Sequence, residues 1–125
     1  MAERRSFSRR ERVAEQIRRD LSDLIFLELK DPRIGMISLT GVEVTADYAH
    51  AKVFFSALSG RDHLPDILAG LEKASGFLRR ELGKRITLHT IPQLRFVFDD
   101  SLERGAELSD LIRQAMSISD SPENS

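Results

Sequence analysis

The chain has 125 residues, with 31% charged side chains, a formal net charge of −1 and no cysteine. This length suffices for one domain with its own hydrophobic core, and the lack of cysteine excludes disulfides and thiolate metal sites. No stretch approaches the ~18 consecutive apolar residues of a membrane-spanning helix. We therefore expect no membrane segment and no secretory signal, and the composition fits a reducing cytoplasm.

The near-zero net charge hides a strong asymmetry along the chain. Residues 1–20 hold seven basic and four acidic side chains, and residues 73–85 hold five basic and one acidic. Residues 99–125 hold two basic and seven acidic side chains. Two local basic regions of this kind indicate a polyanionic partner.

The first predicted helix begins at Ser8, which forms a capping-box pattern with Glu11. Residues 1–7 precede it as an arm that carries Arg4 and Arg5. Apolar residues recur along the helix at helical spacing, namely Val13, Ile17, Leu21, Leu24 and Ile25. Asp31-Pro32 ends the helical region, because proline disfavours the α conformation of the residue before it.

Three extended segments are predicted. In residues 35–45 the alternating apolar side chains stand at odd positions before Gly41 (37 and 39) and at even positions after it (42 and 44). A switch of this kind at a glycine predicts a β-bulge. Residues 51–58 alternate cleanly, and the short connection at 47–50 predicts a hairpin. Residues 94–98 form a third strand, after a connecting segment at 86–92.

Residues 64–86 are predicted to form the central helix of the fold. Its apolar stripe is Leu64, Ile67, Leu68, Leu71, Ala74, Leu78 and Leu82. The stripe runs across Gly76, and a glycine inside a helix costs ~1 kcal/mol relative to alanine. This cost predicts a kink at Ala74-Ser75-Gly76, or a close approach of another backbone there.

The last helix is predicted to be capped by Asp100-Ser101 and to carry Leu102, Ala106, Leu108, Ile112 and Met116. Residues 117–125 are polar and are expected to be disordered. The order helix, strand, strand, long interrupted helix, strand, helix predicts a two-layer α+β domain with helices on one face of a three-stranded sheet. We assign residues 1–116 to this single domain.

Several segments resemble the ribosome-binding factor A family. They are residues 31–35 (DPRIG), 42–47 (VEVTAD), 51–56 (AKVFFS), 74–79 (ASGFLR) and 92–101 (PQLRFVFDDS). The resemblance covers roughly residues 5–116 in order and without large gaps. Each segment alone is weak evidence for the family, but the set of segments in this order is specific to it.

The resemblance implies a type II KH-like domain, with the third strand parallel to the first. It also implies a cytoplasmic factor in late maturation of the small ribosomal subunit, associated with its ribosomal RNA and with growth in the cold. The Gly-x-x-Gly turn of RNA-binding KH domains is missing. Ala74-Ser75-Gly76 stands in its place, which argues against ordinary single-strand KH recognition and leaves backbone contact by the basic helix intact.

Lys73, Arg80 and Lys84 fall on one line of the central helix, opposite its apolar stripe. Such a row suits phosphates, because neutralising them releases counterions; the alternative is a solvated helix face. The N-terminal arginines form a second RNA-contact region or a solubilising face. The candidate RNA-binding set is Lys73, Ser75, Gly76, Arg79, Arg80, Lys84, Arg85, Arg4, Arg5, Arg9 and Arg10.

No nucleophile–base pair, phosphate loop or metal-ligand spacing is found, so we expect no enzyme activity, no metal and no cofactor. His50, His63 and His89 are scattered, and Asp99-Asp100 are expected to end a strand and cap a helix. The leading interpretation is a non-catalytic monomer that binds RNA and the ribosome. The alternatives are a protein–protein adaptor that docks an assembly GTPase through the acidic C-terminal helix, and a small hydrolase.

Overall fold

The computed structural model describes residues 8–119. Its elements are α1 (Arg9–Glu28), β1 (Ile37–Val44), β2 (His50–Ala57), α2 (Leu64–Arg85), β3 (Gln93–Phe98) and α3 (Ser101–Ser119). The predicted element types and order are confirmed. Arg4 and Arg5 of the candidate set lie outside the described residues.

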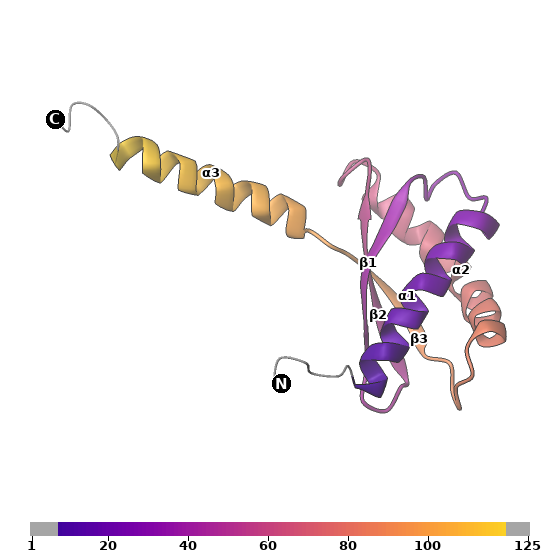
Figure 1. The fold of residues 1–125 in the computed structure, drawn as a ribbon. Coiled ribbons are helices and arrows are strands. Elements are labelled where there is room, and N and C mark those ends of the chain that lie inside the picture. The colour runs from indigo at the N-terminus through magenta and orange to yellow at the C-terminus, as the bar shows by residue number, and fades with distance from the viewer. Residues whose placement is uncertain (1–7, 120–125) are drawn as a thin grey trace.

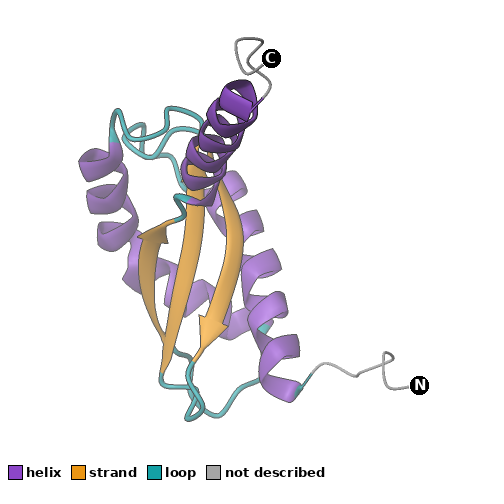
Figure 2. Ribbon diagram, turned by 90° about the vertical axis from the view of Figure 1, so that its left-hand side faces the viewer, coloured by secondary structure: helices purple, strands orange, loops and turns teal. Residues whose placement is uncertain are grey.

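The domain has two layers, with α1 and α2 packed on one face of the sheet (Figure 1). The core lies between these layers and has Phe55, Val53 and Ile17 at its centre, all fully buried. In the view onto the other face of the sheet, α3 stands in front of the strands (Figure 2). The helices therefore do not all share one face, and that part of the prediction is wrong for α3.

α1 begins as the sequence predicts. The Glu11 backbone N–H donates to the Ser8 hydroxyl at 3.1 Å, and the Ser8 N–H donates to the Glu11 carboxylate at 2.9 Å. This reciprocal capping box satisfies donors that a helix start otherwise leaves unpaired. Ala14, rather than its neighbour Val13, is the first residue of the buried stripe.

β1 and β2 pair as an antiparallel hairpin, and the register shifts between Leu39 and Gly41. The bulge predicted from the parity change is thus confirmed. Its effect is to let Leu39 and Val44, which have opposite parity in the sequence, both point into the core. Tyr48 has a φ of +61° in the turn, the only non-glycine residue with positive φ among those described.

β3 pairs with β2 in parallel, and the sheet order is β1-β2-β3. Because β1 and β2 are antiparallel, β3 is antiparallel to β1. The expectation that the third strand runs parallel to the first is therefore wrong. The crossover through α2 returns the chain to the end of the sheet where β2 begins, and a strand added beside β2 must then run in the same direction.

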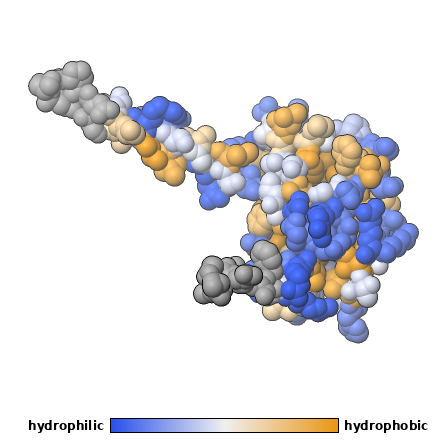
Figure 3. All heavy atoms as spheres, in the orientation of Figure 1, coloured by the Kyte–Doolittle hydropathy of each residue, from blue (hydrophilic) through white to orange (hydrophobic). Residues whose placement is uncertain are grey.

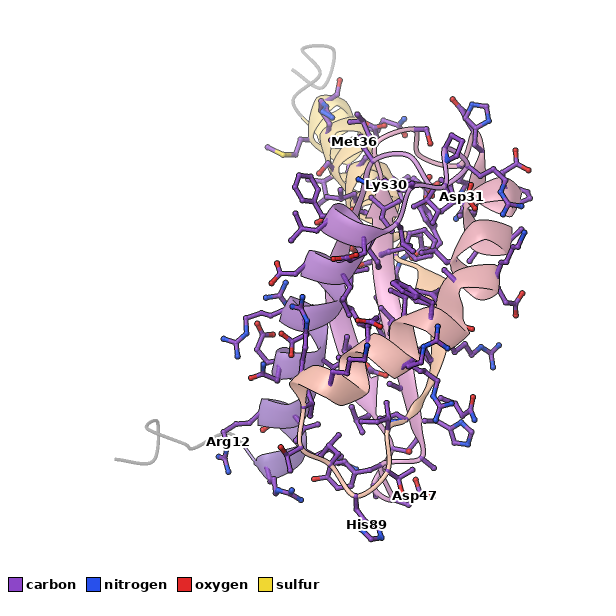
Figure 4. The ribbon with its side chains drawn as sticks, turned by 90° about the vertical axis from the view of Figure 1, so that its right-hand side faces the viewer. Arg12, Lys30, Asp31, Met36, Asp47 and His89 are labelled. Atoms are coloured by element: carbon purple, nitrogen blue, oxygen red, sulfur yellow. The ribbon has the colours of Figure 1, made fainter. Side chains whose placement is uncertain are left out.

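α2 is one uninterrupted helix, and its axis changes direction near its middle (Figures 1 and 4). Gly76 is not a close-approach site, because a Cβ there would meet no atom within 4 Å. The close approach occurs six residues earlier, at Gly70, where a Cβ would lie 2.9 Å from Ile34 Cγ1. The sequence offered two explanations for a glycine at position 76, a kink in the helix or the close approach of another backbone. Only the kink agrees with the structure.

α3 continues to Ser119, so residues 117–119 are helical rather than part of a disordered tail. Residues 120–125 lie outside the described range. Asp99 caps the start of α3, since its carboxylate accepts the Ser101 backbone N–H at 2.9 Å. Hydrogen bonds from the Thr40 hydroxyl and from Ser101 lower the pKa of Asp99.

Candidate nucleic-acid interface

The basic row of α2 consists of Lys73, Arg80 and Lys84, and all three side chains are exposed. The buried residues of the same helix are Ile67, Gly70, Leu71, Leu78 and Leu82. Because the row lies opposite Ile67, Leu71, Leu78 and Leu82, it faces away from the sheet. The predicted geometry of the row is therefore present.

The three cations of the row differ in the interactions that they make with other side chains of the domain. Lys84 Nζ lies 3.0 Å from a Glu81 carboxylate oxygen, and the Arg80 guanidinium lies 5.9 Å from the centre of the Phe77 ring. Lys73 contributes to the lowered pKa of Asp31, although the main cause is the hydrogen bond from Arg33. Exposed pairs of this kind are weak, so each cation is available to a phosphate.

Ser75 and Gly76 lie between the two halves of the row. The Ser75 hydroxyl donates to the Glu72 carbonyl oxygen at 2.9 Å, a back-bond that often accompanies helix bending. Gly76 is exposed and has no positive φ. At this point the helix therefore presents a small, open surface, where another molecule can approach the backbone closely.

Arg79 has a different environment from its neighbour Arg80. Its side chain is half-buried, and it donates from Nη2 to the Ile91 carbonyl at 2.7 Å and from Nε to the Pro92 carbonyl at 3.0 Å. These bonds attach the 86–92 segment to α2. The guanidinium is thus held inside the domain, which is a positioning role for the segment before β3.

Arg85 lies at the end of α2 and links it to α1. Its Nη1 is 3.8 Å from Asp20 Oδ1 and 3.7 Å from Asp23 Oδ2. These distances are ion pairs rather than hydrogen bonds. A cation in the last turn also interacts favourably with the helix dipole, so Arg85 has a structural function of its own.

α1 supplies the second basic region, on the same layer as α2. Arg9 and Arg10 are exposed at its start, and the Arg9 guanidinium lies 5.6 Å from the centre of the Tyr48 ring. Arg12 points outward from the lower end of α1, near the 86–88 loop (Figure 4). The surface over α1 is largely hydrophilic (Figure 3).

Arg12 was not in the candidate set, nor were Arg19 and Lys30 of the same layer. Arg19 is exposed on α1 and donates to Gln16 at 3.1 Å, and Lys30 lies just after α1, near Asp31 (Figure 4). A single lysine before Asp31-Pro32 gives no signal in a sequence. Only the packing of α1 beside α2 places it at the edge of the basic layer.

The carboxylates with lowered pKa values have structural partners. Arg33 holds the pKa of Asp31 at about 2, and the Thr45 hydroxyl and the Ala49 N–H lower that of Asp47 in the hairpin turn. Within residues 8–119 no three potential metal ligands cluster. In the same range every helix is too short or too polar to cross a bilayer.

A model of the family described as ribosome-binding factor A matches residues 9–112. The chain belongs to the ribosome-binding factor A family. It is 64% identical over 117 residues to ribosome-binding factor A of Dechloromonas aromatica, covering 94% of each chain. The resemblance noted from the sequence segments is thereby confirmed.

Solved structures of the family share the fold. The crystal structure of ribosome-binding factor A from Thermus thermophilus matches with a TM-score of 0.65 at 24% identity, covering 71% of this chain and 93% of that one. A homology model of the factor from the same species, fitted into a cryo-EM map of a 30S complex, matches with a TM-score of 0.61 at 23% identity, covering 73% and 96%.

Proposed function

We propose that this chain binds the small ribosomal subunit through its ribosomal RNA, and that it acts in late maturation of the subunit. The observation that carries the proposal is the basic row Lys73, Arg80 and Lys84, exposed on the layer that also carries Arg9, Arg10 and Arg12. Family membership supports the partner, since a Thermus thermophilus relative has been fitted into a map of a 30S complex.

The proposed contact is to the phosphate backbone. Lysine and arginine on a helix surface neutralise phosphates without reading sequence, so they position the protein rather than specify a base. The open surface at Ser75 and Gly76 lets an RNA backbone approach α2 between the two halves of the row. Arg79 and Arg85 serve this surface indirectly, because they hold the 86–92 segment and α1 against α2.

The protein is proposed to act without catalysis, as a cytoplasmic monomer that supports growth in the cold. The perturbed carboxylates favour this, since hydrogen bonds keep Asp31, Asp47 and Asp99 ionised as acceptors in turns and caps. A carboxyl group that acts as a general acid or base near neutral pH needs a raised pKa instead. We propose no role for these groups in proton transfer.

The test is co-sedimentation of the protein with purified ribosomal particles at several salt concentrations. We expect association with free small subunits and little with full ribosomes, and binding that weakens steeply as salt rises. Equal association with both particles would contradict a role in maturation. Binding that is insensitive to salt would contradict the phosphate contact.

A second candidate function is a protein–protein adaptor, for example one that docks an assembly GTPase. The observation that favours a protein partner is the exposed apolar side of α3. Digesting the RNA separates the two candidates, because only a direct protein contact survives nuclease treatment.

A further inference from the structure

α3 extends away from the rest of the molecule. It leaves the sheet on the face opposite α1 and α2 and extends beyond it (Figures 1 and 2). Of the side chains of α3 that the structure describes, at 101–117, none belongs to the hydrophobic core and all but Glu103 are exposed. Most of the stability of a helix in a protein comes from packing of its amphipathic face rather than from its intrinsic propensity.

One side of α3 is apolar along its length (Figure 3). At ~100° per residue, Leu108, Leu111, Ile112 and Met116 fall on one face of the helix. Between 51% and 61% of each side chain is exposed. We call these four residues the α3 stripe. A contiguous exposed apolar surface of this kind marks an interaction site.

The base of α3 is fixed to the domain. Asp99 accepts the Thr40 hydroxyl at 2.6 Å, and the Arg61 Nε lies 2.8 Å from Glu103. The same guanidinium lies 5.1 Å from the centre of the Phe98 ring. These contacts give the helix a defined direction at its start, and the residues of the stripe lie beyond them.

The charge of α3 argues against RNA as its partner. Glu103, Glu107 and Asp110 lie on the side of the helix away from the stripe. The two arginines of α3, Arg104 and Arg113, are paired with Asp100 and Asp110, so the described part of the helix has no surplus of cations for a phosphate backbone. The basic row of α2 lies on the opposite face of the sheet. The two surfaces therefore point in different directions and suit different ligands.

The area of the stripe argues against a second copy of the chain. A stable interface buries about 1,200 Å² or more in total, and four side chains from each of two paired helices fall short of this. A groove encloses a helix on both flanks and buries more of it. Basic residues at the rim of such a groove would complement the acidic side of α3.

We propose that α3 is a docking helix that inserts the α3 stripe into an apolar groove, with a basic rim, on a protein of the small ribosomal subunit. The inference rests on the proposed function, because it places the groove on the same particle. It makes the chain bivalent: the α1–α2 layer holds RNA and α3 holds protein. Linking two contacts in this way raises the overall affinity.

The first experiment places a photo-crosslinking amino acid at Ile112 in the full chain, which is then bound to purified small subunits. Gln114 is the matched control position, because it is exposed on the opposite side of the same helix. We expect Ile112 to cross-link to a protein that survives nuclease digestion, and Gln114 to do so much less. Adducts to RNA, to a second copy or to the sheet of its own chain would overturn the proposal.

The second experiment compares two double variants. The stripe variant combines Leu108→Asp and Ile112→Asp, and the control variant combines Gln114→Asp and Ser117→Asp. Both variants add the same charge, and neither changes the core. We expect the stripe variant to bind small subunits at least tenfold more weakly while keeping its affinity for protein-free ribosomal RNA. The control variant should bind both like the wild type. Unchanged binding of the stripe variant to small subunits would overturn the docking helix alone, whereas a wild type that binds neither particle nor RNA would remove the proposed function as well.

Discussion

Gly70 of α2 packs directly against Ile34, so that a Cβ at Gly70 would lie 2.9 Å from Ile34 Cγ1. Ile34 is buried, with 3% of its surface exposed, and it follows the Asp31-Pro32 turn. The Asp31 carboxylate is also near, at 3.3 Å from the same Cβ position. This contact attaches the segment after α1 to the middle of α2.

Replacing Gly70 by alanine should therefore lower stability. Overpacking a core contact costs about 1–3 kcal/mol, and the better helix propensity of alanine returns ~1 kcal/mol of it. We expect a net loss of up to about 2 kcal/mol in the free energy of unfolding, measured by denaturant titration. Gly76→Ala is the matched control in the same helix and should gain up to ~1 kcal/mol. Equal effects at the two glycines would contradict this assignment of the contact.

Arg79→Gln should destabilise the domain rather than weaken RNA binding directly. It removes hydrogen bonds from a charged donor to the Ile91 and Pro92 carbonyls, each typically worth about 1.5–3 kcal/mol. Arg80→Gln, one residue along, should change stability by no more than about 0.5 kcal/mol and should weaken RNA binding. Unfolding curves and binding to small subunits, measured on both variants, distinguish the two roles. The assignment would fail if Arg79→Gln kept full stability.

Changing Lys73, Arg80 and Lys84 together to Gln should weaken binding to ribosomal RNA and flatten its dependence on salt. Each lost phosphate contact reduces the slope of log K against log salt by about 0.7–0.9. Sequence preference should not change. The control is Lys52→Gln with Arg95→Gln, which removes two cations that face each other across β2 and β3. If the control lost as much binding as the triple variant, the RNA surface would lie elsewhere.

The Asp31–Arg33 pair predicts an acid-sensitive contribution to stability. Arg33 lowers the pKa of Asp31 from its ordinary value to about 2 in the folded state. A carboxylate with a depressed pKa stabilises the fold above its unfolded pKa of about 3.9, and this contribution is lost as the pH falls through about 2. Between these pH values the stability of Asp31→Asn should fall less steeply than that of the wild type, as followed by thermal unfolding. Parallel curves would show that the pair contributes nothing.

Features set by local sequence were the ones that could be predicted. The capping box at Ser8 and Glu11 involves residues three apart, and the bulge at Gly41 follows from a change of parity within one strand. The buried stripe of α2 follows from its periodicity. Its charged face follows in turn, which is why the row Lys73, Arg80 and Lys84 was found without a structure.

Features that depend on distant segments could not be predicted. Nothing near Arg79 shows that its acceptors are carbonyls 12 and 13 residues further along. The pattern of α2 draws attention to Gly76, whereas Ile34, which contacts Gly70, comes from another part of the chain. The amphipathic pattern of α3 predicts a covered face but does not say what covers it, so the position of α3 away from the core came only from the structure.

The central position of β2 has a consequence for how the chain folds as it is synthesised. β2 meets β1 through a tight local turn, but it meets β3 only after the whole crossover through α2. Pairing between segments far apart in the sequence is slow, because the loop between them must close first. Until residues 93–98 leave the ribosome, one edge of β2 has no partner and can pair wrongly with another chain. A protein with this topology is thus most prone to aggregate during its own translation.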